Sequence, residues 1–186
     1  LSAQQFRHTQ LVDRLAELMA QHGTSPELLE LEITETEAMA EPETAREVLL
    51  RLRELGVSIA LDDFGTGYSS LSYLRLLPVS RLKIDREFIR QVMHNHHDAL
   101  LVRAMIGMAH TLGLPVVAEG VEEVAQLEFL HSNHCESYQG WHFAKALPAV
   151  DISRMLEGVD RTTAFEQRQL AERRTPAKQP AAPYPQ

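Results

Sequence analysis

The amino-acid sequence predicts an α/β protein built on a parallel β-sheet. Five segments with the pattern of strands alternate with segments in which apolar residues recur every three to five positions, as on one face of a helix. Such an alternation is typical of parallel strands joined by right-handed helical crossovers. The chain has 186 residues, 44% of them hydrophobic, which suffices for one domain with its own core and excludes a second large domain.

The predicted elements follow one another along the chain. Apolar residues at positions 6, 11, 15 and 18 predict a helix over residues 2–21, with Ser2 as its N-cap. Alternating apolar and polar residues predict a first strand over 29–34. A helix over 42–55 ends at Gly56 and another over 99–112 ends at Gly113, because glycine commonly follows a helix. The other predicted elements are strands at 57–62, 81–85, 115–119 and 138–143, and helices at 71–77, 121–130 and 150–156.

The C-terminal end differs in composition from the rest of the chain. A polar helical stretch is predicted for residues 159–174, and residues 175–186 carry prolines among small residues, a composition typical of disorder. We therefore expect a main domain over residues 1–158, a helical extension over 159–174 and a disordered tail over 175–186.

Charge and cysteine content limit the partners and the compartment. The 18 basic and 26 acidic side chains give a formal net charge of −8, which argues against a nucleic-acid polymer as partner. A single cysteine, Cys135, excludes an intramolecular disulfide and favours a reducing compartment, the cytoplasm. Polar residues and a proline interrupt the apolar stretch at 99–118, so no membrane span is predicted in this segment. Because the chain starts at Leu1 without a signal peptide, we expect a fragment of a longer protein, whose upstream part can carry a membrane anchor.

Polar residues within the predicted strands share one face. Successive side chains of a strand point to opposite sides, so Ile59 and Leu61 lie on one face and Asp62 on the other. The same rule sets apart a group of polar residues near the carboxyl ends of the strands: Glu32, Asp62, Lys83, Asp85, Glu119 and Gln139, with Trp141 on the side of Gln139. Sites of parallel α/β proteins are built at these ends, so we expect the six polar residues to converge on one pocket.

Such a cluster of carboxylates points to bound metal. Carboxylates close together repel one another and raise one another's pKa unless cations neutralise them. Ligands that are all oxygens favour Mg²⁺ or Mn²⁺ over zinc. Lys83 can hold or deprotonate a water among them. For any single carboxylate a salt bridge or a helix N-cap is an equally good interpretation, but not for all six residues together.

Five motifs occur together in the order of a known enzyme family. The longest is Asp62-Asp-Phe-Gly-Thr-Gly-Tyr-Ser-Ser-Leu71. The others are Glu32-Ile-Thr-Glu35, Lys83-Ile-Asp85, Ala118-Glu-Gly-Val-Glu122 and Gln139-Gly-Trp141. This set, covering about residues 1–148, resembles the motifs of the EAL-domain cyclic-di-GMP phosphodiesterases. The main domain is therefore identified as a partial EAL phosphodiesterase domain.

The resemblance implies a fold and an activity. The fold would be a modified (β/α)8 barrel of the TIM type, incomplete here with five of its eight strands. The activity would be that of a bacterial signal-transduction hydrolase, which cleaves cyclic di-GMP to linear pGpG with two divalent cations, Mg²⁺ or Mn²⁺. The Glu-Ala-Leu signature, a following Arg and an Asn would precede residue 1, so we expect the isolated fragment to be inactive. Family members are often fused upstream to GGDEF or sensor domains, and a homodimer is compatible with the resemblance.

The resemblance also implies which residues hold the cations. Glu32 would bind the first cation, Asp62 would bridge both cations, and Asp63 and Glu119 would hold the second. Lys83 would orient or deprotonate the attacking water. Each metal role suits a carboxylate oxygen.

Further roles are implied around the metal residues. Glu122 and Gln139 would position waters and substrate, and Glu35 would brace the loop that follows Asp62. The loop itself would be formed by Gly65, Thr66 and Gly67, with glycines where the backbone approaches phosphate. Asp85 and Trp141 would contact substrate.

Two other interpretations remain open at the level of sequence. One is a degenerate receptor that binds cyclic di-GMP without cleaving it, although every carboxylate of the five motifs is retained. The other, independent of the resemblance, is a barrel enzyme that stabilises an enolate with Mg²⁺ and uses Lys83 as its base. Cleavage of a model phosphodiester separates the enolate enzyme from the phosphodiesterase. The sequence departs from the family at Lys145-Ala146, where Arg-Pro or Lys-Pro is usual at a minor substrate contact.

Overall fold

The fold is a parallel sheet with helices between successive strands. The structure, a computed structural model, describes residues 1–6, 8, 10–67 and 71–158. The chain divides into two compact units, residues 1–142 and residues 143–186. The whole sheet belongs to the first unit, and helix α9 (Ala149–Gly158) belongs to the second. The helix predicted at 159–174 and the tail predicted at 175–186 lie outside the described residues.

Five strands pair in the order in which they follow along the chain, each parallel to the next. They are β1 (Glu30–Thr34), β2 (Ser58–Phe64), β3 (Arg81–Ile84), β4 (Val116–Ala118) and β5 (Ser137–Tyr138). Strands that are neighbours both in sequence and in the sheet are the connectivity of a TIM-type barrel wall. The predicted α/β fold class is therefore confirmed.

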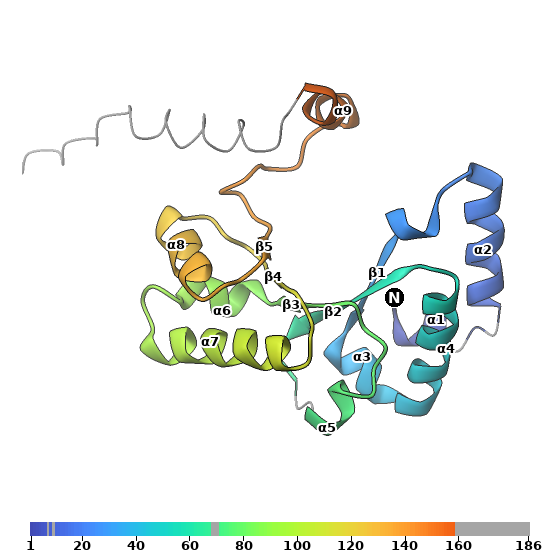
Figure 1. Cartoon of the computed structure of the whole chain (residues 1–186), viewed down its shortest axis with the longest axis horizontal. Helices are drawn as coiled ribbons and strands as arrows, with labels where there is room; N and C mark the ends of the chain where they lie inside the picture. The colour runs from blue at the N-terminus through green and yellow to red at the C-terminus, as the bar shows by residue number, and fades with distance from the viewer. Residues whose placement is uncertain (7, 9, 68–70, 159–186) are drawn as a thin grey trace, which may run out of the picture. The chain divides into compact units, whose positions relative to one another are not determined.

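The helices of the first unit flank this sheet. They are α1 (Ala3–Phe6), α2 (Leu11–His22), the 3₁₀ turn η1 (Pro26–Leu28), α3 (Glu35–Ala40), α4 (Pro42–Glu54), α5 (Leu71–Leu74), α6 (Arg86–Gln91), α7 (His96–Thr111) and α8 (Val124–Ser132). Figure 1 shows α3 and α4 beside β1 and β2, and α6, α7 and α8 beside the later strands. Within the described residues, no helix combines the length and the apolar character that crossing a membrane requires.

The hydrophobic core is formed by one face of the strands and the buried faces of the helices. Ile33, Ile59, Leu61, Leu82 and Ile84 are at most 1% exposed. Against them pack α4 and α7, through the buried residues Leu49, Leu52, Val102 and Ile106. Because these apolar side chains occupy one face of each strand, the alternate positions are free to carry the polar residues of a site.

Two helices begin directly at strand ends where the sequence analysis left loops. Thr34, the last residue of β1, forms a capping box with Glu37, in which its hydroxyl accepts from the Glu37 amide and the Glu37 carboxylate accepts from the Thr34 amide. Asp85 caps α6 and accepts a 2.6 Å hydrogen bond from the Glu87 amide. The transitions from β1 and β3 into helices are thus fixed by local side-chain bonds.

Two predicted helices are longer than the observed ones. The helix predicted over 2–21 is wrong as a single element, because the structure has α1 and α2 in its place. The sequence between Phe6 and Leu11 contains no apolar residue, so a continuous helix would gain no packing energy there. The helix predicted over 71–77 ends already at Leu74, shortly before Pro78.

The last strand is shorter than the predicted 138–143, because the chain folds over the segment that follows β4. After β5, the Gln139 amide donates to the Ala118 carbonyl oxygen and the His142 amide donates to that of Val121. Gly140, with φ +155°, lies so near this segment that a Cβ would come 2.2 Å from the Val121 carbonyl oxygen. A side chain at residue 140 has no room, and the chain turns there.

Candidate active site

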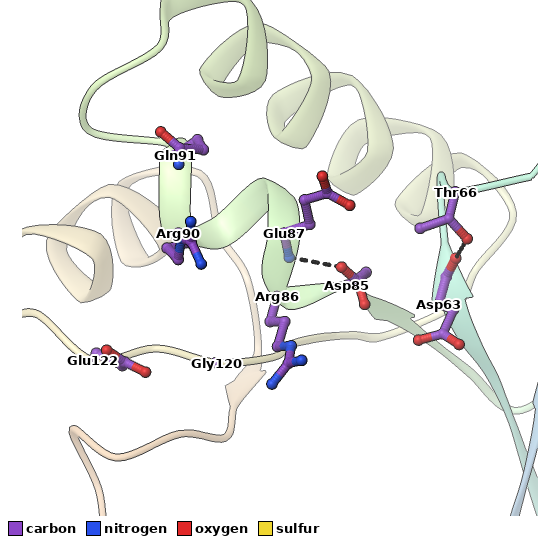
Figure 2. A pocket seen from close by; sticks show the side chains of 9 residues that line it. All are labelled: Asp63, Thr66, Asp85, Arg86, Glu87, Arg90, Gln91, Gly120 and Glu122. Carbon is purple, nitrogen blue, oxygen red and sulfur yellow. Dashed lines mark hydrogen bonds between the residues drawn. The ribbon is translucent and has the colours of Figure 1, made fainter.

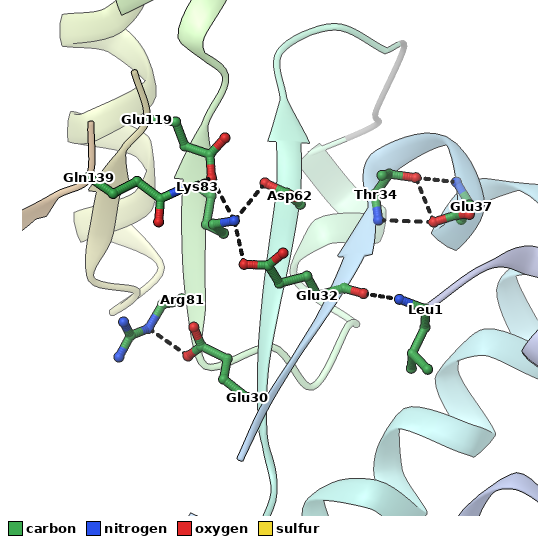
Figure 3. Close-up of polar contacts among 10 residues, drawn as sticks. All are labelled: Leu1, Glu30, Glu32, Thr34, Glu37, Asp62, Arg81, Lys83, Glu119 and Gln139. Carbon is green, nitrogen blue, oxygen red and sulfur yellow. Dashed lines mark hydrogen bonds and ion pairs between the residues drawn. The ribbon is translucent and has the colours of Figure 1, made fainter. Parts of the chain in front are cut away.

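Lys83 on β3 is surrounded by three carboxylates. Its Nζ lies 2.5 Å from Glu32 Oε1, 2.5 Å from Glu119 Oε1 and 3.1 Å from Asp62 Oδ1. These carboxylates come from β1, from β2 and from the residue after β4, and Figure 3 shows them pointing toward the ammonium group. The structure thus brings together, from separate strands, residues that the alternation of side chains placed on one face.

Burial and charge shape this cluster, which we call the Lys83 cluster (Glu32, Asp62, Lys83 and Glu119). The Lys83 side chain is only 5% exposed, and burial by itself would lower its pKa. Hydrogen bonds to Glu119 and Glu32 outweigh that effect, so the pKa of Lys83 lies above its ordinary value. Lys83 is therefore an ammonium donor suited to holding an oxygen atom. Burial raises the pKa of Glu119, although Lys83 acts in the opposite direction.

A β-bulge brings a second carboxylate to the end of β2. Pairing between β2 and β3 shifts from Leu61–Leu82 to Phe64–Ile84, so β2 advances one residue more than β3. Asp63 lies in this bulge with φ +53°. Regular alternation would place Asp63 on the face opposite to Asp62, whereas the bulge directs it into a neighbouring cavity. Burial, and then the negative charges of Asp62 and Asp85, raise the pKa of Asp63.

A polar cavity of about 590 Å³ adjoins Asp63. Its lining residues are Asp63, Thr66, Asp85, Arg86, Glu87, Arg90, Gln91, Gly120 and Glu122. Figure 2 shows Arg86 and Arg90 on α6, with Asp63 of β2 to one side of them and Glu122 of the segment after β4 to the other. Sequence reasoning singled out the carboxylates Asp63, Asp85 and Glu122 but missed Arg86 and Arg90. The signal was present, because Arg86 follows the Lys-Ile-Asp motif directly and Arg90 lies one helical turn later.

The loop after β2 is held by a buried carboxylate. Glu35 at the start of α3 is 2% exposed and accepts a 3.1 Å hydrogen bond from the Gly65 amide. A Cβ on Gly67 would lie 2.8 Å from Glu35 Oε1, so this glycine permits the close approach. The Thr66 hydroxyl donates to the Asp63 carbonyl oxygen at 2.8 Å and closes the turn.

Two further residues lie at the edge of the site. The Gln139 side-chain amide donates to Glu119 Oε1 at 2.7 Å, so Gln139 joins the Lys83 cluster from the segment after β5. Trp141 lies in the turn beyond it, with 61% of its surface exposed. Asp85 faces the cavity and also caps α6, as described above.

The chemistry of these side chains suits a divalent cation. Glu32, Asp62, Asp63 and Glu119 offer carboxylate oxygens, which Mg²⁺ and Mn²⁺ prefer. Asp62 Oδ1 is buried and makes no hydrogen bond, its contact with Lys83 being an ion pair. No group of three His, Cys, Asp or Glu in the described residues already surrounds a single point where an ion would lie. The carboxylates of the Lys83 cluster are arranged around the ammonium group instead.

A parallel barrel-type sheet with carboxylates and a lysine at the carboxyl ends of its strands is the arrangement on which proteins of the TIM-barrel class build their sites. The chain belongs to the EAL domain family, whose model matches residues 1–146. It is 47% identical over 152 residues to the bifunctional diguanylate cyclase/cyclic di-GMP phosphodiesterase MucR of Pseudomonas aeruginosa, covering 82% of this chain and 22% of MucR. To the cyclic di-GMP phosphodiesterase NbdA of the same organism it is 48% identical over 146 residues, covering 78% of this chain and 19% of NbdA.

Solved structures agree with this family membership. The structure described as "PaMucR Phosphodiesterase, c-di-GMP complex" matches with a TM-score of 0.79 and 46% identity, over 82% of this chain and 62% of that one. A manganese/cyclic di-GMP complex of Klebsiella pneumoniae BlrP1 matches with a TM-score of 0.70 and 33% identity, over 76% of this chain and 36% of that one. The chain spans about a fifth of the length of MucR and NbdA. The family resemblance found in the sequence is confirmed.

Proposed function

We propose that this chain carries the metal-binding carboxylates of a phosphodiesterase that hydrolyses cyclic di-GMP to linear pGpG. The observation that carries the proposal is the Lys83 cluster, with three carboxylate oxygens within 3.1 Å of one ammonium group. Similarity to MucR and NbdA, both named as cyclic di-GMP phosphodiesterases, supports the choice of substrate.

In the proposed site, Glu32, Asp62, Asp63 and Glu119 would hold two divalent cations, Mg²⁺ or Mn²⁺. The manganese complex of BlrP1 supports the kind of cofactor. Such ions, when bound, generate a nucleophile from water at neutral pH and stabilise the attacking and leaving oxygens. Asp62 and Asp63 are consecutive residues at the bulge, which suits an Asp62 shared between two ions.

The other side chains would bind and orient the substrate. Lys83 would hold the oxygen that attacks phosphorus, because an ammonium group donates to oxygen. Arg86 and Arg90 in the cavity would pair with phosphate oxygens, which guanidinium groups bind well. Glu122 would position substrate from the opposite side of the cavity, and Asp85 would contact it beside α6. The exposed ring of Trp141 offers an aromatic face on which a base can stack.

The proposal extends to the context of the chain. MucR is named as both a diguanylate cyclase and a phosphodiesterase, so we expect a GGDEF or sensor domain in the same polypeptide. A homodimer and a cytoplasmic location belong to the same proposal.

Hydrolysis assays test this function directly. Purified protein is incubated with cyclic di-GMP and either Mg²⁺ or Mn²⁺, and pGpG is followed by chromatography. The assay uses both the 186-residue chain and a polypeptide that includes the sequence encoded upstream. In the described sheet β1 and β5 are the outer strands, so we expect turnover only in the longer polypeptide. Tight binding without any product would indicate a receptor, and the absence of both binding and product would refute the proposal.

A further inference from the structure

We infer that Lys83 is a positioning residue that sets the affinity of the site for divalent cations, acting as a fixed counter-ion to their carboxylate ligands. This inference rests on the proposed function, because it takes Glu32, Asp62 and Glu119 as ligands of the cations. It concerns how strongly the ions are held, which is separate from any contact of Lys83 with water or substrate.

Lys83 contacts every carboxylate of its cluster. Its Nζ lies 2.5 to 3.1 Å from one oxygen of each of Glu32, Asp62 and Glu119. Glu32 lies on β1, Asp62 on β2 and Glu119 directly after β4, so the ammonium group is the common partner that links them (Figure 3). With one positive charge for three negative charges, the cluster keeps a negative excess that attracts a cation.

The Lys83 side chain is buried beside two carboxylates that are themselves largely buried. The Lys83 side chain is 5% exposed, and the side chains of Asp62 and Glu119 are 18% and 15% exposed, whereas that of Glu32 is 51% exposed. Charges at this depth are weakly screened by solvent, so an incoming cation experiences the charge of Lys83 as well as that of its ligands. Each oxygen that accepts a hydrogen bond from Lys83 is also less available to an ion.

Two effects of opposite sign follow. Lys83 stabilises the protein in the absence of ions, because it offsets the repulsion between carboxylates that lie close together. The same charge weakens the binding of a divalent cation to those carboxylates. Replacing Lys83 by a neutral residue should therefore lower the melting temperature of the ion-free protein and, at the same time, tighten cation binding. A residue with a merely structural role would not produce the second effect.

Strand β3 contains a matched control. Arg81 lies two residues before Lys83 and forms an ion pair with Glu30 at 2.9 Å. Its guanidinium group pairs with a carboxylate outside the Lys83 cluster, toward the other end of the same strand (Figure 3). Arg81→Met therefore removes a positive charge and an ion pair from β3 without changing the charge of the cluster.

Titration calorimetry with MnCl₂ or MgCl₂ measures the affinity in the purified parent protein, Lys83→Met and Arg81→Met. A unit charge close to an ionisable group changes the pKa of that group by one or more units. One unit corresponds to a tenfold change in an equilibrium constant. We therefore expect Lys83→Met to bind the ion at least about tenfold more tightly than the parent does. The added ion should also raise the melting temperature of Lys83→Met by more than it raises that of the parent. Arg81→Met should bind the ion as the parent does.

The outcomes separate this inference from the function on which it rests. A parent protein that binds neither ion would refute the proposed metal site itself. A parent that binds ions, with equal or weaker binding in a folded Lys83→Met, would refute the role of Lys83 as counter-ion. If circular dichroism shows Lys83→Met to be unfolded, Lys83→Gln retains a hydrogen-bond donor without the charge, and the same comparison then decides.

Discussion

The side-chain amide of Gln139 donates a 2.7 Å hydrogen bond to Glu119 Oε1, the oxygen that also lies 2.5 Å from Lys83 Nζ. Gln139 follows β5 and Glu119 follows β4, so this bond ties the ends of two neighbouring strands together. Both donors hold Glu119 in one orientation within the Lys83 cluster. A substitution of Gln139 would therefore disturb the orientation of Glu119, a proposed metal ligand, without changing the charge of the Lys83 cluster.

In the longer polypeptide that includes the upstream sequence, we expect Gln139→Ala to lower kcat/KM for cyclic di-GMP by about tenfold, equivalent to about 1.4 kcal/mol. The free energy of unfolding should change by less than about 1 kcal/mol, because Gln139 is exposed and its bond lies at the surface. Steady-state kinetics and urea unfolding measure the two quantities. Gln10→Ala serves as the control, since Gln10 at the start of α2 makes no capping hydrogen bond with its side chain. Parental kinetics in Gln139→Ala would mean that Glu119 is oriented without Gln139.

The sequence allowed the sheet and part of the site to be predicted because both depend on local patterns. Strands predicted at 29–34, 57–62, 81–85 and 115–119 agree closely with β1 to β4, since each is a short apolar segment, with polar residues alternating in β1 and toward the ends of the others. The same alternation predicted that Glu32, Asp62 and Lys83 share a face. Each of these predictions required only the two-residue period of a strand.

Other features depend on contacts between distant residues and could not be predicted from a local pattern. The bulge that directs Asp63 into the cavity arises from the pairing of β2 with β3. The early end of β5 arises where Gly140 meets Val121, in a segment about twenty residues earlier. Arg86 directly follows the Lys-Ile-Asp motif, but its place in the cavity with Arg90 depends on α6 beginning at Arg86.

In the longer polypeptide that includes the upstream sequence, Asp62→Asn should reduce hydrolysis of cyclic di-GMP by at least about 100-fold, corresponding to about 3 kcal/mol of lost charge stabilisation. The amide keeps the shape of the carboxylate, so the circular dichroism spectrum should remain that of the parent. The side chain is 18% exposed and pairs with Lys83, and the substitution removes the negative charge that a cation would require. Assays with Mg²⁺ and with Mn²⁺ both measure the loss.

Asp13→Asn is the matched control for this change of charge. Asp13 pairs with Arg51 at 3.1 Å on the surface, where its side chain is 69% exposed, and surface ion pairs contribute little. Activity of Asp13→Asn should equal that of the parent. Near-parental turnover in Asp62→Asn would contradict the assignment of Asp62 as a metal ligand.

Gly65→Ala should destabilise the loop that Glu35 holds. Gly65 has φ +99°, and an added Cβ would lie 2.3 Å from Met105 Cε and 2.9 Å from the Phe88 ring. Strain and overpacking together should cost about 1 to 3 kcal/mol in the free energy of unfolding. Gly107→Ala is the opposite case, because a Cβ there, on an exposed position of α7, meets no atom within 4 Å.

We expect Gly107→Ala to stabilise the protein by about 0.5 to 1 kcal/mol, the usual gain for alanine over glycine in a helix. Urea midpoints of the two variants should therefore move in opposite directions from that of the parent. Equal stability of Gly65→Ala and the parent would show that the loop after β2 tolerates a side chain at this point.

Glu136 predicts a dependence of stability on pH. Its carboxylate accepts a 2.8 Å hydrogen bond from the Val116 amide and lies 2.8 Å from His110 Nε2, so it joins β4 to α7. Burial acts to raise the pKa of Glu136, but the Val116 amide and His110 outweigh it and lower the pKa below the ordinary value of 4.5. The folded protein thus binds this proton more weakly than the unfolded chain.

The contribution of Glu136 to stability is therefore present above pH 4.5 and is lost as the pH falls through the lowered pKa. Glu136→Gln should be less stable than the parent at pH 6, by less than about 1 kcal/mol because the side chain is 44% exposed. Toward pH 3 the difference in urea midpoint should shrink, since the parent then loses the same charge. Glu128→Gln, on the exposed side of α8, should match the parent at both pH values. The charge of the Glu136 carboxylate contributes to stability only where that carboxylate is ionised. If the urea midpoint of Glu136→Gln differs from that of the parent by the same amount at pH 6 and pH 3, the effect of the substitution comes from shape or packing and the prediction is wrong.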